Sequence, residues 1–172
     1  MHQRLNDNDY KKDAVSLAAE LPGKLLCRKT GRKLVKLRIT ETEAYYGEAD
    51  TACHAHKGKT KRTGIMYDEG GHTYVYLCYG IHWMLNVVTG RKDFPEAVLI
   101  RGVEGFDGPG KLTRALAIDG KLNGENLIES KKLWIEDDGE RPVYKTSKRI
   151  GIAYASEEDQ NRLWRFTVEP SK

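Results

Sequence analysis

Residues 34–46 alternate between apolar and polar side chains, which is the pattern of a strand with one buried face. Three branched apolar residues occupy every second position: Val35, Leu37 and Ile39. Continued at the same spacing, the buried face carries Glu41, Glu43 and Tyr45. The pattern therefore places two carboxylates on the core side of the strand, where an unpaired charge is costly.

The spacing of apolar residues predicts five further strands and two helices. The strands are expected at 73–79, 82–89, 97–103, 132–136 and 163–168. The helices are expected at 10–21, which ends at a Pro-Gly pair, and at 110–119, which has a proline near its first turn. Gly80 and Ile81 alone separate the strands at 73–79 and 82–89, so these form a hairpin. Residues 137–148 are expected to form a loop.

Strands outnumber helices in this prediction and adjoin through short turns, which favours an antiparallel α+β fold. No break in composition suggests a second domain. We therefore expect residues 1–172 to form a single domain, with residues 1–9 flexible. Its core would be a curved, largely antiparallel, open-barrel-like sheet with flanking helices.

Composition narrows the class of protein. The 172 residues are 39% hydrophobic and 31% charged, with a net charge of +4, as in soluble globular domains. Basic residues concentrate at 28–38, 57–62 and 145–149; solvated faces or contacts with nucleic acid both explain them. No apolar run approaches the roughly 20 residues of a membrane span, so no membrane partner is expected. The three cysteines favour reduced thiols in a cytosolic setting.

The acidic positions have three explanations. The strand leaves the core after Ile39, so that both glutamates are solvated, or one of them pairs with a nearby arginine. Alternatively, a glutamate is a general base at the floor of a cleft, flanked by an aromatic ring. Of the two glutamates, Glu41 is expected to be the structural or paired one.

The sequence TACHAHKG, which begins at Thr51, raises the possibility of zinc through Cys53, His54 and His56. No second pair of ligands follows at the spacing of a zinc site, so no metal site is expected. His54 lies on the loop that leaves the acidic strand. It is therefore placed to fold back over the same pocket as Glu43.

The hairpin carries several tyrosines. Tyr74, Tyr76 and Cys78 share one face, and Tyr79 lies at the tip beside a glycine. Core packing explains the tyrosines within the strand. An aromatic ring at an exposed tip is harder to explain by packing, and it could act as a wedge between base pairs.

Residues 105–112, GFDGPGKL, nearly match the phosphate-binding P-loop. Leu112 stands where that motif has a magnesium-binding hydroxyl, and Pro109 removes a backbone N–H. Nucleotide hydrolysis is therefore disfavoured. Gly108 and Gly110 more simply allow a tight turn into a helix, whose start could receive a phosphate of nucleic acid.

Three stretches together resemble the alkyladenine (3-methyladenine) DNA glycosylase family of base-excision repair. They are ETEAY followed by a histidine, TYVYLCYG followed by Asn86, and GPGKLTRALAI. Their order and spacing agree with the family from about Ala14 to Val168. The resemblance implies a monofunctional enzyme, without cofactor or metal, that removes damaged purines from double-stranded DNA.

The resemblance also assigns roles to residues. Glu43 is similar to the base that activates water to attack the sugar C1′, and Arg101 to an arginine that holds the flipped nucleotide and the water. The damaged base would be enclosed by Tyr45, His54, Tyr76 and Asn86, of which Asn86 crowds the 2-amino group of normal guanine. Tyr79, with Ile81 beside it, would intercalate into the DNA. Residues 150–152 resemble a late segment that lines the same site.

Family substrates include 3-methyladenine, 7-methylguanine, hypoxanthine and ethenoadenine, and the sequence does not rank them. We expect a monomer, located in the cytoplasm and near the nucleoid in a bacterium, or in the nucleus of a eukaryote. A different class of function is a catalytically silent domain that binds distorted nucleic acid. Such a domain would use the wedge and the basic runs without needing Glu43.

Overall fold

The strand β3 (Lys33–Tyr46) is the element around which the sheet is built in this computed structural model, which describes residues 2–170. The first half of β3 pairs with β2 (Leu25–Thr30). Its second half pairs with β6 (Glu96–Val103) on one side and β10 (Arg165–Val168) on the other. All three pairings are antiparallel, and they place the acidic residues of β3 between two other strands.

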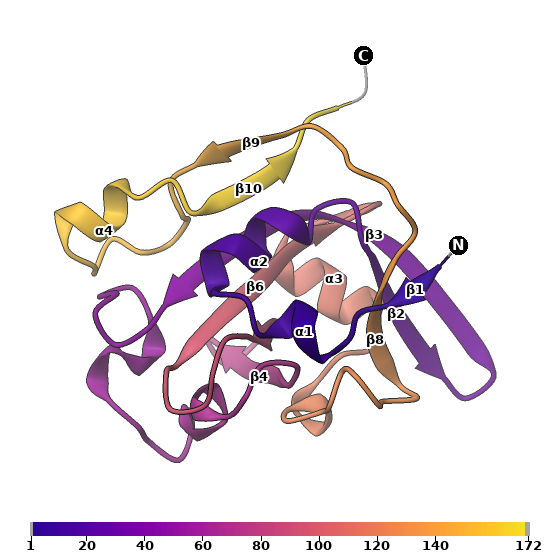
Figure 1. Cartoon of the computed structure of the whole chain (residues 1–172), viewed down its shortest axis with the longest axis horizontal. Coiled ribbons are helices and arrows are strands. Elements are labelled where there is room, and N and C mark those ends of the chain that lie inside the picture. Colours follow the sequence, from indigo (N-terminus) through magenta and orange to yellow (C-terminus); the bar gives the residue numbers. More distant parts are fainter. Residues whose placement is uncertain (1, 171–172) are drawn as a thin grey trace.

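The remaining strands extend this centre into a ten-stranded sheet (Figure 1). They are β1 (Gln3–Arg4), β4 (Thr73–Cys78), β5 (His82–Val88), β7 (Phe106–Asp107), β8 (Leu133–Asp137) and β9 (Tyr144–Ser147). The main path runs β1-β8-β2-β3-β6-β5-β4, with β9 joined to β10 and β7 to β6. Within the described residues β1 and β4 do not pair with each other, so the sheet stays open. The expected α+β fold with an open antiparallel sheet is confirmed.

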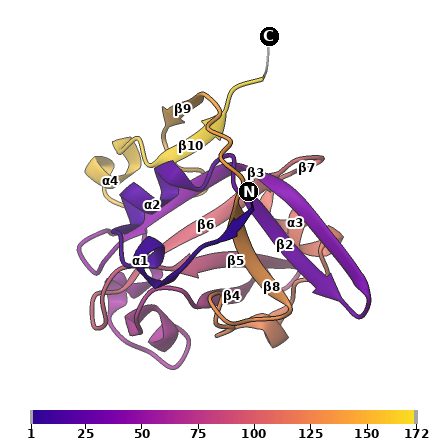
Figure 2. The same ribbon diagram turned by 45° about the vertical axis from the view of Figure 1, so that its right-hand side comes forward.

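Short helices cover parts of the sheet. They are α1 (Asp7–Tyr10), α2 (Ala14–Glu20), α3 (Pro109–Ala115) and α4 (Glu157–Asn161), with 3₁₀ turns η1 (His54–Lys57), η2 (Gly64–Tyr67) and η3 (Gly120–Leu122). Figure 2 shows α2 running over β3 and β6, and these elements pack together. Among residues 2–170 no helix combines the length and apolar character that crossing a membrane would require.

A bulge in β3 changes which side chains face the core. The pairing between β3 and β6 shifts register between Ile39 and Glu41 and again between Glu41 and Thr42. Ile39 and Ala44, five positions apart, consequently belong to the same buried cluster. In a regular strand they would point to opposite faces. The prediction that Glu43 continues the apolar face of Ile39 is therefore wrong, because the bulge turns the acidic residues to the opposite side.

The strands predicted at 34–46, 73–79, 82–89 and 97–103 match β3, β4, β5 and β6 to within one residue at each end. The helix predicted at 110–119 ends earlier, at Ala115, and β2 was not predicted. The predicted helix at 10–21 is instead split, because the Asp13 side chain accepts the Ser16 N–H and starts a new helix. The predicted loop at 137–148 contains β9, whose exposed polar residues give no strand pattern. Gln3 and Arg4 pair with β8. The flexibility expected of residues 1–9 stays a prediction, and residue 1 lies outside the described residues.

Candidate active site

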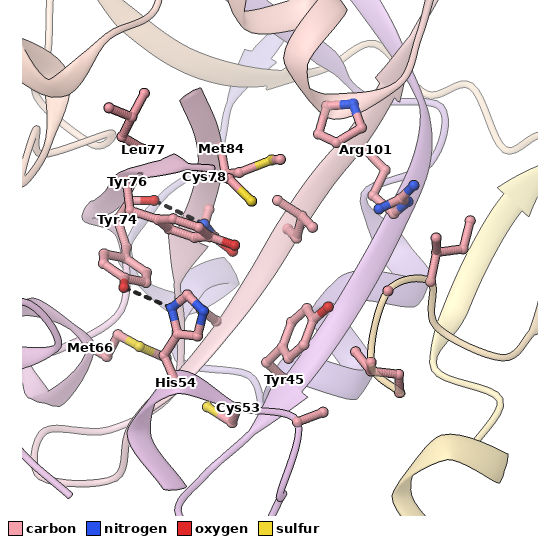
Figure 3. Close-up of a pocket in the computed structure, with 18 of the residues that line it drawn as sticks. Tyr45, Cys53, His54, Met66, Tyr74, Tyr76, Leu77, Cys78, Met84 and Arg101 are labelled. Atoms are coloured by element: carbon pink, nitrogen blue, oxygen red, sulfur yellow. Dashed lines mark hydrogen bonds between the residues drawn. The ribbon is translucent and has the colours of Figure 1, made fainter. Parts of the chain in front are cut away.

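A cavity of about 500 Å³ opens on the face of the sheet to which Tyr45 points. Most of the residues predicted for the site line it: Tyr45, His54, Tyr76, Tyr79, Asn86, Arg101, Ile150 and Ile152. Figure 3 shows His54, Tyr74 and Tyr76 gathered on one side of the cavity, with Tyr45 and Arg101 on the other. Residues that lie far apart in the sequence thus enclose one space, and aromatic rings stand on both of its sides.

Glu43 lies behind this lining, and its side chain has no exposed surface. Its Oε1 accepts the Ile150 backbone N–H at 2.7 Å, and its Oε2 accepts the Tyr45 hydroxyl at 2.8 Å. Arg101 Nε lies 3.5 Å from Oε1. Burial raises the pKa of Glu43 above 4.5, while Arg101 and the two hydrogen bonds oppose that rise. Burial therefore increases the affinity of this carboxyl group for a proton, and the neighbouring donors and Arg101 limit the increase.

Glu41 forms ion pairs, as expected for the structural member of the two glutamates. Its Oε1 accepts Arg101 Nε and Arg165 Nη1, both at 3.0 Å. Arg101 thus lies between the two carboxylates, with its closer contact to Glu41. Glu41 thus holds the Arg101 guanidinium that lines the cavity. The contact of Glu43 with Arg101 is longer, at 3.5 Å.

The opposite wall is a cluster of three rings. The His54 and Tyr76 rings are 4.7 Å apart in an edge-to-face arrangement, and Tyr74 and Tyr76 are 5.1 Å apart. His54 Nδ1 is 2.9 Å from the Tyr74 hydroxyl. Burial and the neighbouring Arg62 lower the pKa of His54 to about 4, so the ring is neutral near pH 7. Tyr74 was missed as a site residue, although it shares a strand face with Tyr76.

Asn86 lies on β5 and is buried at the cavity. Its Nδ2 donates a hydrogen bond to the Tyr74 carbonyl at 3.1 Å, which fixes the orientation of the carboxamide. Asn86 also stands opposite Leu99 of β6 in the sheet register. The side chain is thus held in one place at the floor of the cavity.

The tip of the β4–β5 hairpin projects away from the sheet. Tyr79 is 91% exposed and Ile81 is 68% exposed. Tyr79 has a φ of +51°, followed by Gly80 at +69°, and the Ile81 N–H donates to the Cys78 carbonyl to close the turn. A bulky residue rarely adopts positive φ, and such strain is found mainly at functional sites. The hairpin holds an aromatic side chain out in solvent.

The basic runs predicted from the sequence differ in what their side chains contact. In the run 28–38, Arg28 donates to backbone carbonyls, and Lys36 and Arg38 pair with Glu136 and Asp138, so much of this run serves the fold. Arg62 of the run 57–62 lies over the Tyr76 ring at 4.9 Å and lines the cavity. Arg62 therefore places one cation of the run 57–62 at the cavity.

Arg149 of the run 145–149 is fully buried, and sequence analysis missed its role. It forms a bidentate ion pair with Asp50: Nη1 donates to Oδ2 at 2.6 Å and Nη2 to Oδ1 at 2.9 Å. Nothing in the sequence distinguishes this arginine from its basic neighbours. Its pairing depends on tertiary structure, because Asp50 is 99 residues away.

Both histidines considered for a metal site have hydrogen-bond partners, His54 with the Tyr74 hydroxyl and His56 with the Glu48 carbonyl. Within residues 2–170 no three His, Cys, Asp or Glu side chains are clustered so as to hold a metal ion. Burial raises the pKa of Cys53 to about 12, which disfavours the thiolate that binds metals. Gly108, with φ of +114°, precedes Pro109 at the start of α3, as the turn prediction required.

Comparison with known sequences gives a consistent result. A family model described as Methylpurine-DNA glycosylase (MPG) matches residues 8–107 and 104–172. A protein of Borrelia garinii subsp. bavariensis is 46% identical over 176 residues, covering 95% of each chain. A protein of Psychrobacter cryohalolentis is 46% identical over 171 residues, covering 82% of this chain and 81% of the relative. A protein of Natranaerobius thermophilus is 40% identical over 189 residues, covering 96% of this chain and 95% of the relative. All three relatives are named "Putative 3-methyladenine DNA glycosylase".

The matched ranges contain every element that builds the cavity, from the acidic part of β3 and η1 to residues 150–152. The resemblance that the sequence motifs indicated is therefore confirmed over nearly the whole chain. This chain belongs to the methylpurine-DNA glycosylase family, whose members are hydrolases of N-glycosyl bonds in DNA base-excision repair.

Proposed function

We propose that this protein is a monofunctional DNA glycosylase that flips alkylated or deaminated purines out of double-stranded DNA. It then hydrolyses the N-glycosyl bond with a water molecule activated by Glu43. The observation that carries the proposal is the buried Glu43 carboxylate, which lies beside Arg101 behind a cavity walled by aromatic rings. A pocket of this kind suits a flat base, and the carboxylate suits a water that attacks beside it.

The proposed reaction forms a bond between the water oxygen and C1′ and breaks the C1′–N bond. The water oxygen bonds to C1′ of the sugar as Glu43 takes one of the water protons. The electron pair of the C1′–N bond leaves with the purine. An alkylated purine that carries a positive charge departs as a neutral base, which makes it a good leaving group. An uncharged purine such as hypoxanthine departs as an anion and gains a proton from water, so that the net reaction is again hydrolysis. Arg101, close to both Glu43 and the cavity, orients the water and the nucleotide.

Glu43 must gain contact with water for this step. In the structure, Tyr45 covers it and donates a hydrogen bond to its Oε2. We propose that a base stacking on Tyr45 shifts the hydroxyl and frees Oε2 for the attacking water. A general base positioned in this way contributes typically ~10²–10⁴-fold to a rate.

The aromatic walls account for base flipping. Extruding a nucleotide costs a few kcal/mol, and less where a lesion pairs poorly. Stacking returns about 1–3 kcal/mol per base, so Tyr45 and Tyr76 with His54 offset the cost. A neutral His54 avoids repelling a cationic base. Tyr79 and Ile81 fill the gap left in the duplex, because both are already exposed at a strained tip.

A domain that only binds distorted nucleic acid would use the same hairpin and the same cations. It would gain nothing from Glu43, because burying a charge is costly and is weak support for stability. The placement of that charge beside the cavity therefore favours a hydrolase over a silent binder. The proposed substrates are 3-methyladenine, 7-methylguanine, hypoxanthine and ethenoadenine.

Glu43→Gln tests the proposed base. The variant keeps the shape of the side chain but accepts no proton, so release of hypoxanthine from a defined duplex should fall at least ~10²-fold. Binding to the same duplex should be retained. Glu41→Gln is the companion variant and should lose less activity, because Glu41 acts on Arg101. Base release by Glu43→Gln at the wild-type rate would move the catalytic base elsewhere.

Tyr79→Ser tests the wedge. Removing the ring should weaken binding to a duplex with a central lesion by roughly ten-fold, about 1.4 kcal/mol, since the flipped state loses its stacking partner. Binding to a single-stranded oligonucleotide with the same lesion should change much less. Equal affinity of variant and wild type for the lesion duplex, measured by fluorescence anisotropy, would contradict the wedge role.

Asn86→Ser tests the exclusion of normal guanine. A smaller side chain leaves room for the 2-amino group, so the variant should release guanine or its 2-amino analogues from undamaged DNA faster than wild type. Hypoxanthine, which lacks that group, provides the matched substrate and should be released at a similar rate by both proteins. Guanine release that stays at the wild-type level would remove this role from Asn86.

A further inference from the structure

The buried ion pair between Arg149 and Asp50 has no part in the reaction as proposed above. The Arg149 side chain is 0% exposed and that of Asp50 1% exposed. Arg149 Nη1 also donates to the Ala44 carbonyl at 2.9 Å, and Nη2 to the Asp159 carbonyl at 3.3 Å. Asp50 in turn accepts the backbone N–H groups of Tyr46 and Ala52. One guanidinium thus joins β3, α4 and the loop that leads to His54.

Stability is a poor explanation for this pair. Apolar residues of similar volume often stabilise a protein as well as a buried ion pair does, since both charges must leave water. The pair also leaves Arg149 Nε buried without a hydrogen-bond partner. A buried charged group held at that cost calls for a role that an apolar side chain could not perform.

Two contacts connect Arg149 to the reacting groups. Its neighbour Ile150 donates the backbone N–H to Glu43 Oε1 at 2.7 Å. Its guanidinium carbon lies 4.9 Å from the centre of the Tyr45 ring. Ile150 and Tyr45 both line the cavity, while Arg149 does not, so the guanidinium supports the ring from behind. The hydrogen bond to the Ala44 carbonyl adds a third connection, because Ala44 lies between Glu43 and Tyr45 on β3.

We propose that the Arg149–Asp50 pair is a positioning device for the general base, because it holds the Ile150 N–H on Glu43 and the Tyr45 ring beside it. This inference rests on the proposed role of Glu43. Arg149 and Asp50 are positioning residues and touch no reacting atom. Their effect is to fix the hydrogen bond that favours the charged form of Glu43, and with it the pH range in which the base is ionised.

The pH dependence follows from the groups around Glu43. Those that face it are Arg101 on β6, Tyr45 and Glu41 on β3, Arg165 on β10, and Arg149 and Tyr154, which flank residues 150–152. The Ile150 N–H lowers the pKa of Glu43 against the effect of burial. When that donor is displaced, the pKa of Glu43 rises. The acidic limb of the rate profile, where activity grows with pH, then moves to higher pH.

Arg149→Lys is the most informative variant. Lysine keeps the positive charge but lacks the planar guanidinium, which hydrogen-bonds Asp50 and the Ala44 carbonyl at the same time. Arg162→Lys is the matched control. Arg162 also pairs with a carboxylate, Asp159, and lies over Trp164, but it has no contact with Tyr45 or Ile150 among the described interactions. Single-turnover release of hypoxanthine would be measured from pH 5 to 9, together with lesion-duplex affinity and a thermal melt.

Arg149→Lys should lose at least ten-fold in rate near pH 6, with its acidic limb displaced upward and its lesion affinity within three-fold of wild type. Arg162→Lys should match wild type in all three. A pH profile of folded Arg149→Lys that superimposes on wild type would overturn the inference. If Arg149→Lys is unfolded, Asp50→Asn takes its place, with the same expectations. Failure of both to fold would also overturn it, since the pair would then serve folding alone.

The two proposals fail separately. Base release by Glu43→Gln at the wild-type rate would sink the proposed function, whatever Arg149→Lys does. If Glu43→Gln is inactive and the pH–rate profile of Arg149→Lys matches wild type, only the positioning role is contradicted.

Discussion

The burial of the Glu43 carboxyl group is the constraint on which the rest of the site depends. A carboxylate without exposed surface needs hydrogen-bond donors and a nearby cation. The structure brings them from separate places: Arg101 from β6, Tyr45 from β3 itself and the Ile150 N–H from the late segment. Burial raises the pKa of Glu43 while these groups resist the rise. These contacts hold the carboxyl group beside the cavity while burial increases its affinity for a proton, which are the properties that the proposed general base requires.

The fold makes this convergence possible through β3. Its first half belongs to the β2–β8 side of the sheet, and its second half is enclosed by β6 and β10. The bulge between the halves turns Glu43 away from the core that Ile39 and Ala44 share. Without that change of side, the carboxylate would face α2 and no cavity. The bulge thereby separates the face that stabilises the domain from the face that forms the site.

Sequence patterns predicted what depends on local periodicity or on motifs. The β4–β5 hairpin and the exposure of Tyr79 followed from alternation and turn residues, and family motifs identified Glu43, His54 and Asn86 as candidates. The bulge was missed because a register shift is a property of two paired strands, and β6 is far away in the sequence. Arg149 and Asp50 were missed for a similar reason: each looks like an ordinary surface charge until folding buries them together.

The most direct test of this account is the pKa of Glu43 in the folded protein without DNA. It can be followed by NMR titration of the ¹³C-labelled carboxyl group, assigned by its absence in Glu43→Gln. The account predicts a pKa above the ordinary value of 4.5, because burial outweighs Arg101 and the two hydrogen bonds. A pKa at or below 4.5 would contradict it, since Glu43 would then be a stabilised member of an ion pair and a weak base.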